Sequence, residues 1–198
     1  MKKIILILAS LLMVLLCACA DRTDEPLDAQ DNTAAASQSD AEVLEENKYY
    51  KITSQDFMYS YLLYDDESEV VKTETVNKRP HIDVVDGDIV RVVFQSGTGI
   101  GTQQGYYYDP KNDVFSQTFS AIFDDCSGVV AHGTGNRVIV RDIFSDTVYA
   151  EIEAFSKPFA EVAYPFVGAQ FSSDGSSIDI TYISGDHYEE ITENFKLK

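Results

Sequence analysis

The sequence is short of basic residues: 15 lysines and arginines stand against 33 aspartates and glutamates, which gives a formal net charge of −18. Nucleic acids and anionic lipid headgroups attract positively charged protein surfaces and repel acidic ones. The composition therefore argues against nucleic acid as a partner. It is compatible with cationic partners and with simple solubility.

Long hydrophobic runs are also scarce. The one clear run extends from Ile4 to Leu16, directly after Lys2 and Lys3. It is shorter than the ~20 residues of a membrane-spanning helix, whereas a basic start followed by a short apolar run is typical of a secretory signal. We therefore predict that residues 1–18 are an export signal and that no later segment spans a bilayer.

The end of this run reads Leu16-Cys17-Ala18-Cys19 and resembles the lipobox of bacterial lipoproteins, in which a small residue precedes the cysteine that receives lipid. Ala18 is small and Leu16 is bulky, so Cys19 fits the motif and Cys17 does not. The resemblance implies a diacylglyceryl group on Cys19, and each buried methylene of such chains adds ~0.8 kcal/mol of membrane affinity. We expect the protein to be lipid-anchored to the cell membrane on its extracytoplasmic face.

Cysteine is nearly absent from the remainder, where only Cys126 is left. A single cysteine forms no internal disulfide, so stability must come from a hydrophobic core. A role as nucleophile or redox thiol is disfavoured, because neighbouring Asp124 and Asp125 oppose formation of the thiolate. A packed or idle side chain is the simpler interpretation.

The segment from Ala20 to Lys48 has few large apolar side chains and carries nine acidic residues against two basic ones. Such a composition buries too little surface to offset the entropy of ordering. Residues 19–48 are therefore predicted to be the lipidated cysteine and a disordered acidic linker, followed by a single domain over residues 49–198. About 150 residues is an ordinary size for one domain.

This domain is rich in Val, Ile, Phe and Tyr, which favour strands, and turn signals such as Asp86-Gly87 and Gly135-Asn136 interrupt it often. No segment shows a sustained helical stripe, although Phe159–Tyr164 is a candidate for one short helical turn. The fold class predicted is all-β and antiparallel. The expected strands are Phe57–Tyr64, Val70–Val76, Ile89–Phe94, Gly105–Tyr108, Val114–Phe119, Arg137–Phe144, Val148–Phe155, Ile178–Ile183 and Tyr188–Phe195.

A weak internal repeat relates Val129–Phe155 to Ala169–Phe195 with an offset of 40, so that Gly135 matches Gly175 and Val138 matches Ile178. Meander units of this period are typical of propeller blades. We expect three to four such units. A β-sandwich built from the same meanders is the alternative.

Within the second unit, Phe171-Ser172-Ser173-Asp174-Gly175 resembles the Phe-Ser-Pro-Asp-Gly turn of TolB-like and WD-repeat propellers, with Ser173 in place of proline. The C-terminal half is also similar to uncharacterised exported proteins of Gram-positive bacteria. The resemblance implies blade-like architecture and no particular activity.

Recognisable catalytic and metal motifs are missing. His81, His132 and His187 are scattered without ligand spacing, so no metal and no cofactor are expected. The glycine-rich run Ser96–Gly105 leads into a strand rather than the helix that a phosphate-binding loop needs. It is better interpreted as a flexible hairpin connection, and its length makes it a candidate rim of a binding surface. Carboxylates at Asp65-Asp66-Glu67, Asp109/Asp113 and Asp124-Asp125 are candidates for calcium or for glycosidase chemistry, but aspartate is also a common turn residue.

Tyrosines are the more informative feature. In the strand that contains Tyr106, Tyr107 and Tyr108, alternation places Tyr106 and Tyr108 on one face. Exposed, this pair is a candidate binding surface; buried, it is core. The leading hypothesis is a non-catalytic binding or scaffolding module for an unidentified cell-envelope ligand or protein. The alternative is a hydrolase of cell-wall glycan or peptide.

Overall fold

The computed structural model describes residues 40–197, which belong to one compact unit. The predicted signal (residues 1–18), Cys19 and the first part of the predicted linker lie outside the described residues. In the described range no helix is long and apolar enough to cross a bilayer.

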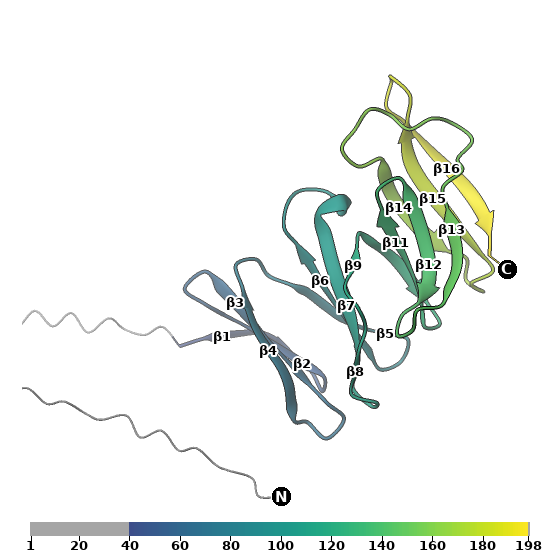
Figure 1. Ribbon diagram of the computed structural model, residues 1–198. Coiled ribbons are helices and arrows are strands. Elements are labelled where there is room, and N and C mark those ends of the chain that lie inside the picture. The colour runs from purple at the N-terminus through teal and green to yellow at the C-terminus, as the bar shows by residue number, and fades with distance from the viewer. Residues whose placement is uncertain (1–39, 198) are drawn as a thin grey trace, which may run out of the picture. The chain divides into compact units, whose positions relative to one another are not determined.

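Strands make up nearly all regular structure in residues 40–197 (Figure 1). The chain runs through β1 (Glu42–Glu46), β2 (Tyr50–Gln55), β3 (Met58–Tyr64), β4 (Val70–Val76), β5 (His81–Val85), β6 (Ile89–Gln95), the 3₁₀ turn η1 (Ile100–Thr102), β7 (Gln103–Asp109), β8 (Val114–Phe115), β9 (Phe119–Ser120), β10 (Ile122–Cys126), β11 (Val129–Thr134), β12 (Arg137–Asp142), β13 (Val148–Ile152), β14 (Phe166–Phe171), β15 (Ser177–Ser184) and β16 (Glu189–Lys196).

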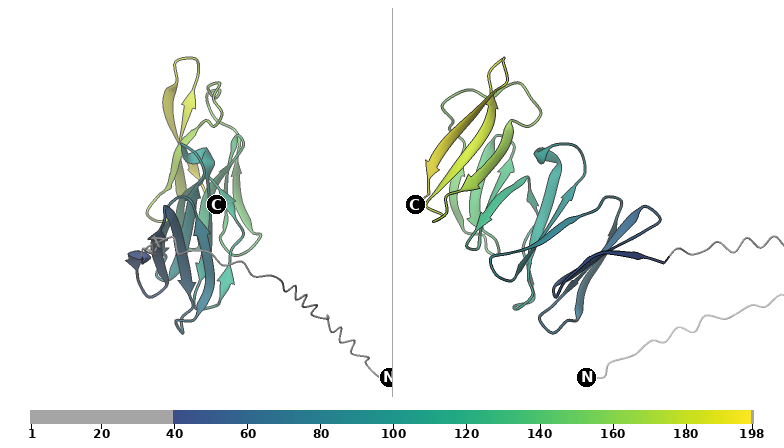
Figure 2. Two further views of the ribbon diagram at one scale, coloured as in Figure 1. Left: turned by 90° about the vertical axis from the view of Figure 1, so that its left-hand side faces the viewer. Right: turned by 180° about the vertical axis from the view of Figure 1, so that it is seen from behind.

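These strands form four antiparallel meanders in chain order. Sheet A is β1-β2-β3-β4, sheet B is β5-β6-β7-β8 with β9 also paired to β7, sheet C is β10-β11-β12-β13, and sheet D is β14-β15-β16. The views in Figure 2 show the same succession from two further sides. The prediction of an all-β fold of propeller-blade-like meanders is confirmed. The β-sandwich alternative is wrong, because the strands divide into four small sheets and not two.

The hydrophobic core is divided among the contacts between successive sheets. One cluster joins sheets A and B and includes Tyr61 and Val92, the next joins B and C through Phe119 and Val130, and the third joins C and D. Each sheet therefore packs against its neighbours in the chain, as repeated structural units do. No core cluster of residues 40–197 joins sheet A to sheet D.

The outward faces of sheets A and D carry polar cross-strand pairs. On sheet A the hydroxyls of Ser60 and Thr75 lie 2.8 Å apart, and on sheet D those of Thr181 and Thr192 lie 2.9 Å apart. Beside the second pair, Asn194 donates to Asp179 at 2.7 Å. Cross-strand polar pairs of this kind end a stacked array, because a further sheet would have to desolvate them.

Buried tyrosines donate to carboxylates in several sheets. Tyr61 donates to Glu74 at 2.5 Å, Tyr107 donates to Asp125 at 3.2 Å, and Tyr182 donates to Glu193. A buried hydroxyl without a partner destabilises the fold, so these pairs allow large aromatic rings to fill the core.

The internal repeat of the sequence corresponds to successive strands. Gly135 lies in the β11–β12 turn with φ 58° and Gly175 lies in the β14–β15 turn with φ 67°, a left-handed conformation that glycine adopts without strain. Val138 and Ile178 follow these turns and are both fully buried. The match at an offset of 40 is thus confirmed as equivalent hairpins.

Two expectations need correction. The domain begins before the predicted boundary at Tyr49, because residues 42–46 form β1 and pair with β2; Leu44 packs on the core and Tyr50 donates to Glu45. The predicted helical turn at Phe159–Tyr164 is also wrong, since Phe159 instead forms an isolated bridge with Ser184.

Candidate ligand cleft between sheets A and B

A surface cleft of about 400 Å³ lies between β4 of sheet A and strands β6 and β7 of sheet B. It is lined by Lys72, Glu74, Val76, Asn77, Lys78, Phe94, Gln95, Ser96, Gln104, Tyr106 and Thr118. Side chains of one face project here because residues alternate across the ladders, as in the neighbouring cross-strand pairs Val92↔Tyr106 and Phe94↔Gln104.

Aromatic rings line the inner part of the cleft. The ring centroids of Phe94 and Tyr106 are 6.2 Å apart, and those of Phe94 and Tyr61 are 5.8 Å apart. Tyr61 belongs to sheet A and the other two to sheet B, so this aromatic contact holds the two sheets together beneath the cleft.

A chain of polar contacts lies over these rings. The Tyr61 hydroxyl donates to Glu74 and lies 2.9 Å from the Tyr106 hydroxyl. Burial raises the pKa of Tyr106 far above its ordinary value, so its hydroxyl stays protonated. Lys72 Nζ lies 4.4 Å from the centroid of the Tyr106 ring and 3.5 Å from Glu74 Oε2, a cation–π contact combined with an ion pair.

The rim of the cleft is rich in amides and hydroxyls. Asn77, Gln95 and Gln104 supply side chains that both donate and accept, and Ser96 and Thr118 add hydroxyls. Lys78 donates to the Ser96 carbonyl at 3.2 Å, and none of the ion pairs within residues 40–197 includes Lys78. The rim can therefore hydrogen-bond a hydroxylated ligand and supply one positive charge.

The predicted surface pair Tyr106 and Tyr108 is brought onto one face, but that face is the core. Tyr106 is 6% exposed and lines the inner part of the cleft. Tyr108 is 0% exposed, stacks on Phe115 with 4.4 Å between the ring centroids and donates to Asp113 at 3.2 Å. An exposed tyrosine pair is therefore a wrong expectation. Tyr107 is buried on the opposite face, because β7 is an interior strand covered on both sides.

The sequence indicated only part of the polar rim: Ser96 and Gln104 belong to the run that was a candidate rim. The amides of the rim are isolated glutamines and asparagines on strands β4, β6 and β7 and the loops beside them, without a common motif. They come together only because sheets A and B pack against each other. The glycine-rich run contributes mostly structure: Gly101 packs against Tyr164, and Gly105 against the Val92 carbonyl.

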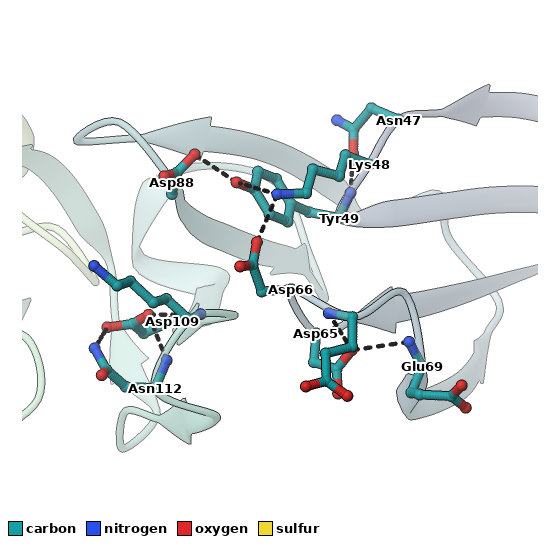
Figure 3. A network of polar contacts seen from close by, with 11 residues as sticks. Asn47, Lys48, Tyr49, Asp65, Asp66, Glu69, Asp88, Asp109 and Asn112 are labelled. Carbon is teal, nitrogen blue, oxygen red and sulfur yellow. Dashed lines mark hydrogen bonds and ion pairs between the residues drawn. The ribbon is translucent and has the colours of Figure 1, made fainter.

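Two of the carboxylates considered for calcium or catalysis, Asp65 and Asp109, serve local structure (Figure 3). Asp65 accepts the backbone N–H groups of Glu67 and Glu69 at 3.0 and 2.8 Å, and Asp109 accepts those of Lys111 and Asn112 at 3.0 and 3.1 Å. These are turn contacts of the kind that aspartate commonly makes.

A second group of polar contacts in Figure 3 ties sheet A to a turn of sheet B. Lys48 pairs with Asp66 at 2.5 Å, and the hydroxyl of Tyr49 donates to Asp88 at 2.5 Å. No group of three or more His, Cys, Asp or Glu side chains able to hold a metal is found among the described residues.

The histidines and the cysteine lie apart from the cleft. His81 is exposed beside Asp83, at 3.9 Å. His132 is buried, and desolvation, together with the nearby Arg141 charge, lowers its pKa to about 4. His187 lies in the exposed β15–β16 turn, and Cys126 is half-buried as a free thiol.

No family model and no curated protein matches the chain. Among solved structures, the chain is similar to Hsv2 of Kluyveromyces marxianus, with 13% identity, a TM-score of 0.41, and coverage of 79% of this chain and 46% of that one. It is also similar to KlHsv2 with loop 6CD replaced by a Gly-Ser linker, with 14% identity, a TM-score of 0.39, and coverage of 80% and 54%. The chain thus spans about half the length of these two structures.

Proposed function

We propose that the protein is a lipid-anchored, extracytoplasmic lipoprotein whose β domain is a non-catalytic binding or scaffolding module at the cell envelope. The lipobox-like residues before Cys19 support the anchor. The cleft between sheets A and B is the ligand site of this proposal, because it combines an aromatic interior with a rim of hydrogen-bonding side chains.

The proposal that the module is non-catalytic is supported by the side chains that line this cleft. Glycoside hydrolysis needs two carboxylates roughly 5–10 Å apart on either side of the scissile bond. The cleft is lined by one carboxylate, Glu74, which already accepts from Tyr61 and pairs with Lys72. A binding role needs no second carboxylate.

The rim chemistry favours a polyhydroxylated ligand. Gln95, Gln104 and Asn77 can bond hydroxyl groups in either direction, and Lys78 would favour an anionic substituent. Cell-envelope glycan combines these features, so a glycan segment is the ligand class we assign to the cleft.

Purified peptidoglycan is the probe that tests this assignment. In co-sedimentation, the Gln104→Ala variant should bind about tenfold less tightly than the parent chain, because a lost hydrogen bond to a ligand in a desolvated site typically costs ~1–2 kcal/mol. Gln170→Ala is the matched control, since Gln170 is an exposed glutamine on sheet D.

Two results would contradict the proposal. Equal binding by Gln104→Ala and Gln170→Ala would remove the cleft from the binding site. Release of soluble fragments from peptidoglycan by the parent chain, abolished by a carboxylate substitution, would show a hydrolase.

A further inference from the structure

Sheet D has one open edge. It contains three strands, whereas sheets A and C contain four strands and sheet B contains five. At the β14 edge, the outward N–H of Phe171 donates to Asp124 of β10 at 2.8 Å, so sheet C covers that side. The open edge is therefore β16, which forms the outer border of sheet D (Figure 2).

The direction of the backbone groups along β16 follows from one hydrogen bond. Leu197 donates to the Ser176 carbonyl at 2.8 Å and extends the register in which Ser177 pairs with Lys196. Because hydrogen-bonded and non-hydrogen-bonded pairs alternate in an antiparallel ladder, the odd-numbered residues bond to β15. The N–H and C=O groups that face outward belong to Glu190, Thr192, Asn194 and Lys196.

The strands at the corresponding edges of the other sheets, β4, β8 and β13, are shortened or irregular, which is how sheet edges usually avoid unwanted pairing. A register shift interrupts the pairing of β4 with β3 and of β13 with β12, and β8 has only two residues. In contrast, β16 has eight residues, no proline, and no shift against β15. It presents a straight row of backbone donors and acceptors.

Apolar surface lies beside this edge. Ile191 and Phe195 project toward the C–D core but remain half-buried. A groove of about 220 Å³ is lined by Leu197, which directly follows β16, and by Val140 and the half-exposed Tyr149 of sheet C, among others. A strand added at β16 would cover Ile191 and Phe195 with its inward-facing residues.

We propose that β16 is a docking edge at which an extended, basic segment of a partner protein adds to sheet D as a fourth, antiparallel strand. Three carboxylates, Glu189, Glu190 and Glu193, outnumber Lys196 on β16, so the edge is acidic. Glu189 also pairs with Lys157 at 3.5 Å, and Glu193 already accepts from Tyr182. A second copy of the chain, at −18, and the acidic segment Ala20–Lys48 would both meet like charge. Opposite charges across paired strands favour a basic occupant instead.

The geometry also specifies the pattern of the incoming strand. Its inward positions opposite Ile191 and Phe195 are apolar, and its inward position opposite Glu189 is basic. Glu193 already accepts from Tyr182 and Ser156 within the fold. Main-chain hydrogen bonds to β16 supply affinity, and this pattern of the incoming strand supplies specificity.

The test uses the full chain in detergent and an end-blocked peptide of the same length as β16. Every second residue of the peptide is threonine, and the positions between the threonines are valine and lysine alternately. Thr192→Pro removes an outward N–H and leaves the β15 ladder intact, and proline is tolerated where an edge N–H faces solvent. Thr192→Ala is the matched control, because it also removes the hydroxyl contact with Thr181 but keeps the N–H.

We expect fluorescence anisotropy to show peptide binding that weakens at least about tenfold in Thr192→Pro and stays within about twofold in Thr192→Ala. Replacing the peptide lysines by glutamates, or methylating its alternate backbone amides, should weaken binding similarly. Equal binding to Thr192→Pro, or of the acidic peptide, would overturn the proposal. The proposal would also be overturned if the chain sedimented as a dimer and the Thr192→Pro variant as a monomer. The occupant of the edge would then be a second copy of the chain.

Discussion

Asp124 and Asp125 are neighbours on β10, and their carboxylates bind the adjacent sheets on opposite sides. Asp124 accepts the backbone N–H of Phe171 in sheet D at 2.8 Å. Asp125 accepts from Arg91 in sheet B and from the hydroxyl of Tyr107 at 3.2 Å. Because successive strand residues point to opposite faces, one dipeptide connects three sheets.

The ion pair of Arg91 and Asp125 predicts a large effect on stability. The side chain of Asp125 is only 7% exposed, and burial raises its pKa despite the nearby guanidinium. Arg91→Met would leave this carboxylate without its counter-ion, and we expect a loss of ~3–5 kcal/mol in the free energy of unfolding, measured by urea titration. Adding Asp125→Leu should recover much of it, and a double variant less stable than Arg91→Met would contradict this account.

Close packing at Gly105 leads to a second prediction. A Cβ at this position would lie 2.5 Å from the Val92 carbonyl oxygen and 2.8 Å from Ile122 Cδ1. Gly105→Ala should therefore destabilise the fold by about 1–3 kcal/mol in thermal or urea unfolding. Gly168→Ala is the control, because a Cβ there meets nothing within 4 Å and should change stability little.

The strands that could be predicted are those that carry their own apolar alternation. Val70–Val76 was expected and observed with the same bounds as β4, and Arg137–Phe144 contains β12. Six strands were not among those expected, because acidic or polar residues, glycine or short length hide their periodicity: β1, β2, β5, β10, β11 and β14. In β10, two aspartates stand where apolar residues would normally mark a strand, and they bind neighbouring sheets instead of water.

The candidate site was harder to predict for a related reason. The sequence correctly placed Tyr106 and Tyr108 on one face, but whether that face is covered depends on the packing of sheet A against sheet B. Local pattern contains no information on such tertiary contacts. The run of three tyrosines was itself a signal of burial on both faces, since an interior strand needs no polar alternation.

Lipid attachment is the third prediction and rests on Ala18 before Cys19. In cells given labelled palmitate, Cys19→Ala should abolish incorporation and lead to accumulation of the precursor. Cys17→Ala should be labelled like the parent chain. Labelling lost with Cys17→Ala and retained with Cys19→Ala would place the anchor at the other cysteine.

Acid sensitivity is the fourth prediction and originates in His132. Its ring packs on Phe119 at 5.1 Å between the centroids, and neither ring nitrogen has a hydrogen-bond partner. Burial and the charge of Arg141 lower its pKa to about 4, although the backbone of Ser120 favours the protonated form. Between pH 6.5 and 4 the unfolded chain therefore binds a proton that the folded chain resists, so stability falls as the pH falls through this range.

The size of this effect follows from the difference between the two pKa values. A shift of one unit corresponds to ~1.4 kcal/mol, so His132 should contribute roughly 2–3 kcal/mol of lost stability on going from pH 7.5 to pH 4.5. Carboxylates titrate in the same pH range, so the His132→Phe variant is measured at both pH values to separate their contribution from that of His132. In urea titrations, the free energy of unfolding of the variant should fall by roughly 2–3 kcal/mol less than that of the parent chain between pH 7.5 and pH 4.5. Equal losses of stability in the two proteins would contradict this account, because they would mean that the folded chain binds a proton at His132 as readily as the unfolded chain does.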